Sequence, residues 1–78
     1  MTNSELARAL ARSFIKRAEA LGYKGKKRDD AALDYFCGAA VLASESGNAS
    51  LATHLGALCA LTISVYGFVA VSQLATRD

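Results

Sequence analysis

Apolar residues recur every three or four positions between about Ser4 and Leu21, a spacing that places them on one side of a helix. Charged residues fall on the opposite side, where we expect them to face solvent. The apolar positions are Leu6, Ala7, Leu10, Ala11, Phe14, Ile15, Ala18 and Leu21, and the charged ones are Arg8, Arg12, Lys16 and Glu19. Thr2, Asn3 or Ser4 can cap the N-terminus of this helix, and Gly22 can end it.

The segment 30–46 is apolar on almost every side of a helical wheel. Asp29 or Asp30 is expected to cap this second helix. Its polar strip consists only of Asp34, Gly38 and Glu45. A helix with so little polar surface is expected to be buried on nearly every side. Because two other helices of one short chain can hardly cover it, the pattern favours a homo-oligomer.

A third helix is predicted over 49–76, after a break at Gly47 and Asn48 and a cap at Asn48 or Ser50. Residues 46–76 contain no Asp, Glu, Lys or Arg, and a helix of this length can cross a bilayer. Large and small residues sort to opposite sides, which favours packing in a soluble oligomer over a membrane anchor. The large residues are Leu51, Leu55, Leu58, Leu61, Val65, Phe68 and Val69, and the small ones are Ala52, Gly56, Ala60, Ser64, Gly67 and Ala70.

Composition narrows the class of protein. The chain has 78 residues, of which 53% are hydrophobic, with a formal net charge of +2, no Pro and two Cys. A disordered tail and a disulfide-stapled miniprotein are therefore excluded. Strand patterns are absent, and the first helix is charged throughout, unlike a secretory signal. We predict a single all-α domain over 1–78, a three-helix hairpin or bundle with helices at about 4–21, 30–46 and 49–76, in the cytoplasm.

Basic residues are concentrated around the connector 22–28. Six of the nine basic residues of the chain lie between Lys16 and Arg28. Cationic side chains, glycines and a helix N-terminus are the parts from which phosphate sites are built, and tyrosines can stack on a base. The predicted ligand-binding residues are Tyr23, Lys24, Lys26, Lys27, Arg28 and Tyr35. The alternative is a solvated connector that Asp29 and Asp30 partly neutralise, since neither a Walker nor a dinucleotide pattern is present.

Other reactive side chains offer little material for catalysis. His54 stands alone, with only Asp34 and Glu45 as conceivable partners, and we interpret it as a surface or subunit-contact residue. Cys37 and Cys59 lie in apolar segments without the spacing of a metal site, and we interpret them as small core residues. We therefore predict no enzyme, no metal and no cofactor.

The chain is short, Ala-rich and free of proline, and we predict helices with one charged loop. In this format it resembles the small accessory proteins of phages and mobile elements, including inhibitors of bacterial defence systems. The resemblance implies a stoichiometric binder that sequesters a nucleotide signal or masks a host protein. We hypothesise capture of a phosphate-bearing ligand, a nucleotide or nucleic acid, at the basic loop. The alternatives are a membrane anchor through 49–76 and a partner-binding face on the first helix. That face consists of Arg8, Arg12, Lys16 and Glu19.

Overall fold

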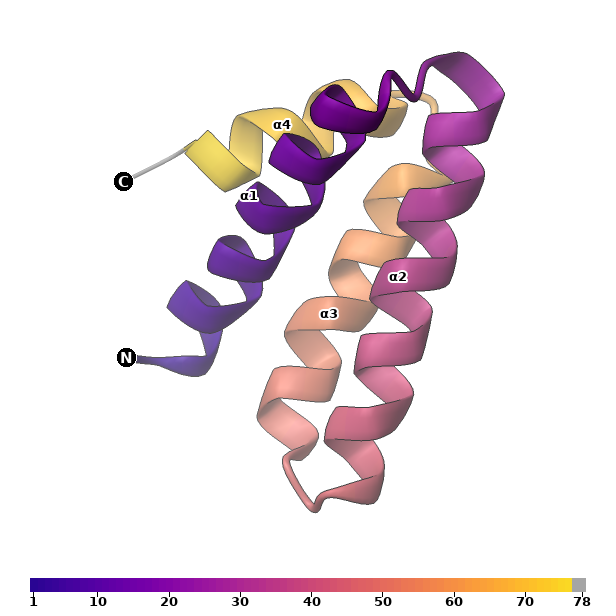
Figure 1. The fold of residues 1–78 in the computed structure, drawn as a ribbon. Coiled ribbons are helices and arrows are strands. Elements are labelled where there is room, and N and C mark those ends of the chain that lie inside the picture. Colours follow the sequence, from indigo (N-terminus) through magenta and orange to yellow (C-terminus); the bar gives the residue numbers. More distant parts are fainter. Residues whose placement is uncertain (77–78) are drawn as a thin grey trace.

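Helices account for nearly all of the chain that the computed structural model describes, residues 1–76. Within this range there are four of them, α1 (Asn3–Leu21), α2 (Gly25–Glu45), α3 (Ala49–Thr62) and α4 (Gly67–Thr76). Figure 1 shows α2 and α3 as a long hairpin, with α1 and α4 lying together against one part of it. The all-α prediction is confirmed, whereas the prediction of three helices is wrong because the third is divided in two.

Both ends of α1 are closed by local hydrogen bonds. The Thr2 N–H donates to Glu5 Oε1 (3.2 Å), and the Glu5 N–H donates to Thr2 Oγ1 (3.1 Å), so the two residues form a capping box. At the other end Gly22 adopts a φ of +73°, which only glycine adopts without strain. Thr2 as the cap and Gly22 as the terminator were both among the residues that the sequence predicted.

The start of α2 differs from the prediction. The helix begins at Gly25 after Lys24, so Asp29 and Asp30 lie inside it and do not cap it. Gly22 and Gly25 both have positive φ, and the chain therefore reverses within three residues. Lys26 Nζ then lies 2.6 Å from Asp30 Oδ2, one helical turn away. The expected basic loop 22–28 is thus a short turn followed by a basic first turn of helix.

The predicted helix 49–76 is interrupted at residues 63–66. Ser64 Oγ accepts hydrogen bonds from the N–H groups of Tyr66 and Gly67, both at 3.3 Å, and Gly67 has a φ of +56°. This turn directs α4 back onto α1 (Figure 1). In residues 1–76 no helix combines the length and the apolar character that crossing a membrane requires. The helix on which the membrane hypothesis rested is therefore not formed.

The break also changes which apolar residues are buried. Leu55, Leu58 and Phe68 are buried as the wheel predicted, but Val65 and Val69 are exposed. The wheel assumed one continuous helix, and the turn resets the angular position of every residue that follows it. The clean separation of large and small residues on a single helix is therefore wrong.

The core is organised around aromatic rings from three helices. The Phe14 ring of α1 lies with its centroid 5.7 Å from that of Phe36 in α2 and 6.1 Å from that of Phe68 in α4. Tyr35 adds a further contact to Phe14 at 5.4 Å. Such tilted aromatic pairs stabilise a fold beyond the area they bury. Leu55, Leu58, Val71 and several alanines complete the buried cluster.

The single chain leaves much of α2 uncovered, as the sequence led us to expect, and its burial on nearly every side stays a prediction for an assembly. Only Ala32, Phe36 and Ala43 of this helix are buried, and Val41 and Leu42 are exposed. The cause is that α2 packs chiefly against α3 and makes few contacts with α1. The accessible surface is 4975 Å², whereas a monomer of this size exposes roughly 4500 Å². The exposed Val41 and Leu42 show that part of this surface is apolar and uncovered within the single chain.

The capping box predicts a pH dependence at the start of α1. The hydrogen bond from the Thr2 backbone, followed by that involving the Thr2 side chain, holds the pKa of Glu5 below its ordinary value. The ionised carboxylate therefore stabilises the helix above its unfolded-state pKa, and this contribution is lost as the pH falls through the folded-state pKa. In Thr2→Ala we expect the pKa of Glu5, measured by NMR titration of its carboxyl carbon, to rise. Equal values in the variant and the parent would contradict this account, and Glu5→Gln is the non-titrating control.

Arg12 links α1 to α4, because its Nη1 donates to the carbonyl oxygen of Ala75 at 3.0 Å. A hydrogen bond from a charged group to the end of a helix also benefits from the helix dipole. We expect Arg12→Ala to lower the free energy of unfolding by about 1–2 kcal/mol and to speed amide exchange in α4. Lys16→Ala, on the same helix, is the matched control. Unchanged exchange in α4 would show that this hydrogen bond does not hold the helix.

Candidate ligand-binding site

A hollow of about 320 Å³ opens where the end of α1, the start of α2 and α4 meet. Apolar side chains form much of its surface, and a few polar ones converge on it, which is the composition of small-molecule sites. We call it the ligand hollow. It is lined by Ile15, Ala18, Glu19, Tyr23, Arg28, Phe68, Val69, Ser72 and Gln73.

Arg28 is the cation that belongs to the ligand hollow. Its Cζ lies 4.1 Å from the centroid of the Phe68 ring, so the guanidinium is packed on an aromatic face. Its Nε is 3.5 Å from Asp29 Oδ1 and makes no hydrogen bond within the described residues. The side chain remains 35% exposed. Arg28 thus presents a positive charge at a fixed position beside an apolar surface.

Tyr23 forms the wall between the ligand hollow and a second one. Its N–H donates to the Ala18 carbonyl at 2.9 Å and that of Gly22 donates to Glu19 at 3.1 Å, the pattern of a Schellman motif. The ring position therefore follows from the way α1 ends. Lys27 Nζ lies 4.8 Å from the centroid of the Tyr23 ring. The second hollow, of about 180 Å³, is lined by Phe14, Arg17, Ala18, Leu21, Tyr23, Ala31 and Tyr35.

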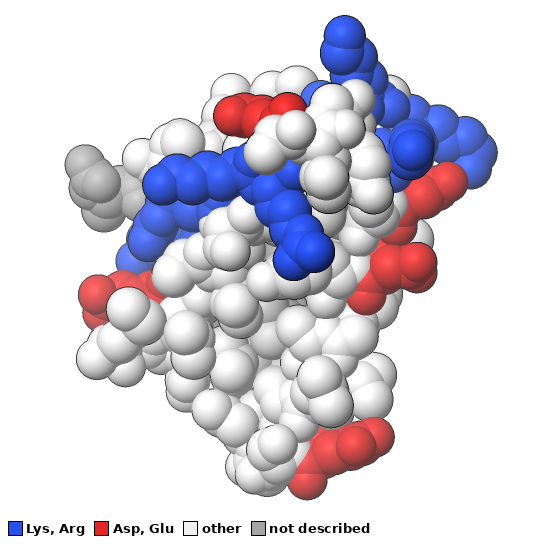
Figure 2. Space-filling model, viewed as in Figure 1, with Lys and Arg blue, Asp and Glu red and all other residues white. Residues whose placement is uncertain are grey.

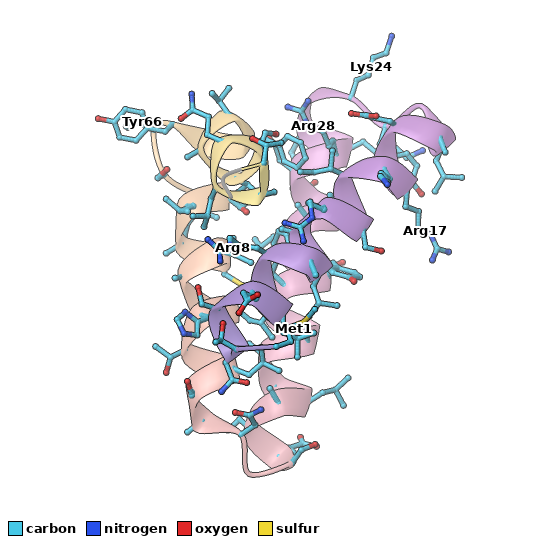
Figure 3. The ribbon with its side chains drawn as sticks, turned by 90° about the vertical axis from the view of Figure 1, so that its left-hand side faces the viewer. Met1, Arg8, Arg17, Lys24, Arg28 and Tyr66 are labelled. Carbon is cyan, nitrogen blue, oxygen red and sulfur yellow. The ribbon has the colours of Figure 1, made fainter. Side chains whose placement is uncertain are left out.

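The six predicted ligand-binding residues therefore divide into two groups. Tyr23, Arg28 and Tyr35 line the two hollows, with Tyr23 shared between them. Lys24, Lys26 and Lys27 are exposed, and Lys26 pairs with Asp30. Figure 3 shows Lys24 pointing outward above Arg28 at the same end of the molecule.

Positive charge gathers at this end. In Figure 2 the Lys and Arg side chains occupy the upper half of the visible face, along α1 on the left and around the place where α1 ends and α2 begins on the right. The lower part, over the far end of the α2–α3 hairpin, shows only acidic and uncharged residues. An anion approaching the molecule is therefore attracted to the end that carries the ligand hollow.

The four residues of the predicted partner-binding face lie along α1 in different surroundings. Arg12 is hydrogen-bonded to Ala75, and Glu19 lines the ligand hollow. Arg8 borders a small hollow of about 120 Å³ together with His54 of α3. Lys16 is exposed. These side chains therefore have different surroundings, although one helix carries them all.

The sequence reasoning missed the contribution of α4. Phe68, Ser72 and Gln73 reach the ligand hollow because the turn at residues 63–66 returns α4 to α1. The available signal was Ser64 followed three positions later by Gly67, since a serine side chain can cap the chain after a helix break. In a run without charges, the same residues also fit a small-residue helix face.

The remaining candidate groups lie elsewhere. His54, Asp34 and Glu45 are exposed, and no group of three or more His, Cys, Asp and Glu side chains placed to hold a metal ion occurs in residues 1–76. The interpretation of the cysteines as core residues is wrong for Cys37, which is exposed, whereas Cys59 is partly buried and packs against the core. Their sulfur atoms are 3.0 Å apart, on adjacent helices.

No family model, curated protein or solved structure matches this chain.

Proposed function

We propose that this protein is a non-catalytic binding protein that captures a nucleotide in the ligand hollow. The observation that carries the proposal is the Arg28 guanidinium, packed on Phe68 at 4.1 Å and facing the same hollow as Tyr23. Aromatic rings beside a positioned arginine suit a ligand that combines a flat base with a phosphate.

The charges in the ligand hollow orient such a ligand. The Glu19 carboxylate would repel a phosphate, so the phosphate belongs on the side of Arg28, towards Lys24 and Lys27. Glu19 and Gln73 can instead form hydrogen bonds with the amino and carbonyl groups of a base. The base is then positioned to stack on the Tyr23 ring.

The size of the ligand hollow favours a small nucleotide over a nucleic acid. Its volume of about 320 Å³ is at the lower end of the range of small-molecule sites, roughly 300–1,000 Å³. A polymer would need a basic groove that follows its backbone over several nucleotides. In the proposed role the protein acts stoichiometrically in the cytoplasm, as the accessory proteins that it resembles in format sequester nucleotide signals.

Calorimetric titration with adenosine monophosphate, adenosine and ribose 5-phosphate tests this proposal directly. We expect the nucleotide to bind more tightly than either fragment, and its affinity to fall as salt is raised. Arg28→Met keeps the packing of the side-chain stem but removes the charge, and it should weaken nucleotide binding roughly tenfold or more. The paired change Lys24→Gln/Lys27→Gln should weaken binding less and reduce its salt dependence.

The matched control is Arg8→Gln/Lys16→Gln, which removes two positive charges from α1 outside the ligand hollow. It should leave the affinity within about twofold, apart from long-range attraction that salt screens. If Arg28→Met binds the nucleotide as tightly as the parent, the assignment of the phosphate to Arg28 is wrong. Tighter binding of a single-stranded oligonucleotide than of any mononucleotide would favour nucleic acid.

A second proposal concerns assembly of the protein with itself. Four apolar residues at the α3–α4 turn, the apolar corner, are largely exposed: Ile63 70%, Val65 96%, Tyr66 72% and Val69 63%. Figure 3 shows Tyr66 pointing outward, with α4 between it and Arg28. Val69 and Gln73 line both the ligand hollow and a shallow depression beside Tyr66. A second copy that covers the apolar corner would therefore also border the ligand hollow and shield it from water.

Light scattering coupled to size-exclusion chromatography tests the assembly. We expect the parent chain to form a homo-oligomer and Val65→Asp to shift it to the monomer, because burying an unpaired carboxylate is strongly unfavourable. Val41→Asp places the same charge on an equally apolar part of α2 and is the matched control. If Val41→Asp dissociates the assembly and Val65→Asp does not, the contact is made by α2. A monomeric parent would overturn self-assembly and favour the masking of another protein.

A further inference from the structure

Cys37 of α2 and Cys59 of α3 face each other across the hairpin. Their Sγ atoms are 3.0 Å apart, about 1 Å longer than the sulfur–sulfur bond of a disulfide. The two residues are 22 positions apart in the chain, and α2 and α3 form the most extensive helix pair of the fold. The packing of α2 against α3 therefore places the two thiols close to bonding distance. The ligand hollow takes no part in this arrangement.

We propose that Cys37 and Cys59 form a reversible intramolecular disulfide by exchange with a low-molecular-weight disulfide such as oxidised glutathione. This site is independent of the proposed nucleotide binding, since neither cysteine lines the ligand hollow. The oxidised chain would have α2 and α3 joined by a covalent bond.

The exposure of the two cysteines sets the order of the steps. Cys37 is exposed, so its thiolate can reach the small disulfide, attack one of its sulfur atoms and release the other as a thiolate. Cys59 is partly buried, and burial, with a smaller contribution from the neighbouring Cys37, raises its pKa to about 12. Cys59 is therefore the resolving thiol.

The second step completes the exchange. Once Cys37 is in a mixed disulfide it carries no negative charge, so its charge no longer raises the pKa of Cys59, and burial remains as the main cause. Cys59 loses its proton to the released thiolate or to solvent and attacks Cys37 Sγ, which expels the second small-molecule thiolate. In total the two protein thiols are oxidised to one disulfide, and the small disulfide is reduced to two thiols.

The disulfide is expected to stabilise the hairpin. It would close a loop of chain and so restrict the unfolded ensemble. The native helices need little rearrangement, because the sulfur atoms already lie close together. For a domain of this size we expect oxidation to raise Tm by roughly 10 °C or more.

The experiment equilibrates the full chain in mixtures of reduced and oxidised glutathione, traps free thiols with an alkylating agent and records intact masses. We expect a monomeric chain that has lost two hydrogen atoms and takes up no alkyl groups, and that dithiothreitol returns to the dithiol. Thermal unfolding of the same samples should show the higher Tm only in the oxidised form.

Single variants distinguish the attacking thiol, Cys37, from the resolving thiol, Cys59. Cys59→Ser should stop at a stable glutathione adduct on Cys37, whereas Cys37→Ser should react with glutathione disulfide much more slowly than Cys59→Ser does. Far-UV circular dichroism checks that both variants fold. The proposal is overturned if the parent chain stays a dithiol, accumulates the glutathione adduct, or forms disulfides only between chains.

Discussion

The fold depends on the position of one aromatic ring, that of Phe14. It contacts Phe36 of α2 and Phe68 of α4, and it is supported from a further side by Tyr35. Consecutive helices α1 and α2 otherwise make few contacts, so the aromatic cluster is the main link between these two helices, while α1 also packs against α3 and α4. The turn at residues 63–66 brings Phe68 to this ring. Phe68 therefore belongs both to the core and to the walls of the ligand hollow.

The molecule has two chemically different ends. One carries the basic surface, the ligand hollow and the apolar corner, and the other is the far end of the α2–α3 hairpin, where Val41 and Leu42 are exposed. Small chains bury a modest fraction of their surface, and here many of the buried positions are occupied by alanine. The large side chains that remain uncovered are the reason for proposing assembly, while the concentration of charge is the reason for proposing an anionic ligand.

Local features of the fold could be predicted from the sequence, and features that depend on distant contacts could not. The amphipathic period of α1, its Thr2 cap and its end at Gly22 each depend on a few neighbouring residues. The run from Lys24 to Arg28 resembled a loop by composition, yet most of it continues as helix because two glycines complete the reversal of the chain early. The turn after α3 lies in an uncharged stretch where Ser64 and Gly67 fit a helix face equally well. Packing of Phe68 on Phe14 distinguishes the two conformations.

The residues of the ligand hollow also divide into those that the sequence predicted and those that it did not. Tyr23, Arg28 and Tyr35 could be found from the sequence because they lie close to the cluster of basic residues. Glu19 was assigned to a different surface, and the α4 residues were missed, since their place in the ligand hollow requires the tertiary fold. The exposure of Cys37 has a related cause. A cysteine in an apolar segment is commonly buried, but α2 makes few contacts with α1, and Cys37 stays exposed although it faces Cys59 of α3.

The ligand hollow is built from the beginning and the end of the described chain, with α1 and the start of α2 on one side and α4 on the other. During synthesis the first half of the site leaves the ribosome well before Phe68 and Gln73 do. A growing chain that ends before α4 therefore carries the basic surface, which attracts anions. It lacks the Phe68 ring and the hydrogen-bonding groups of α4, which would select among those anions. In the proposed function, selectivity for a nucleotide would therefore require α4 to be docked onto α1.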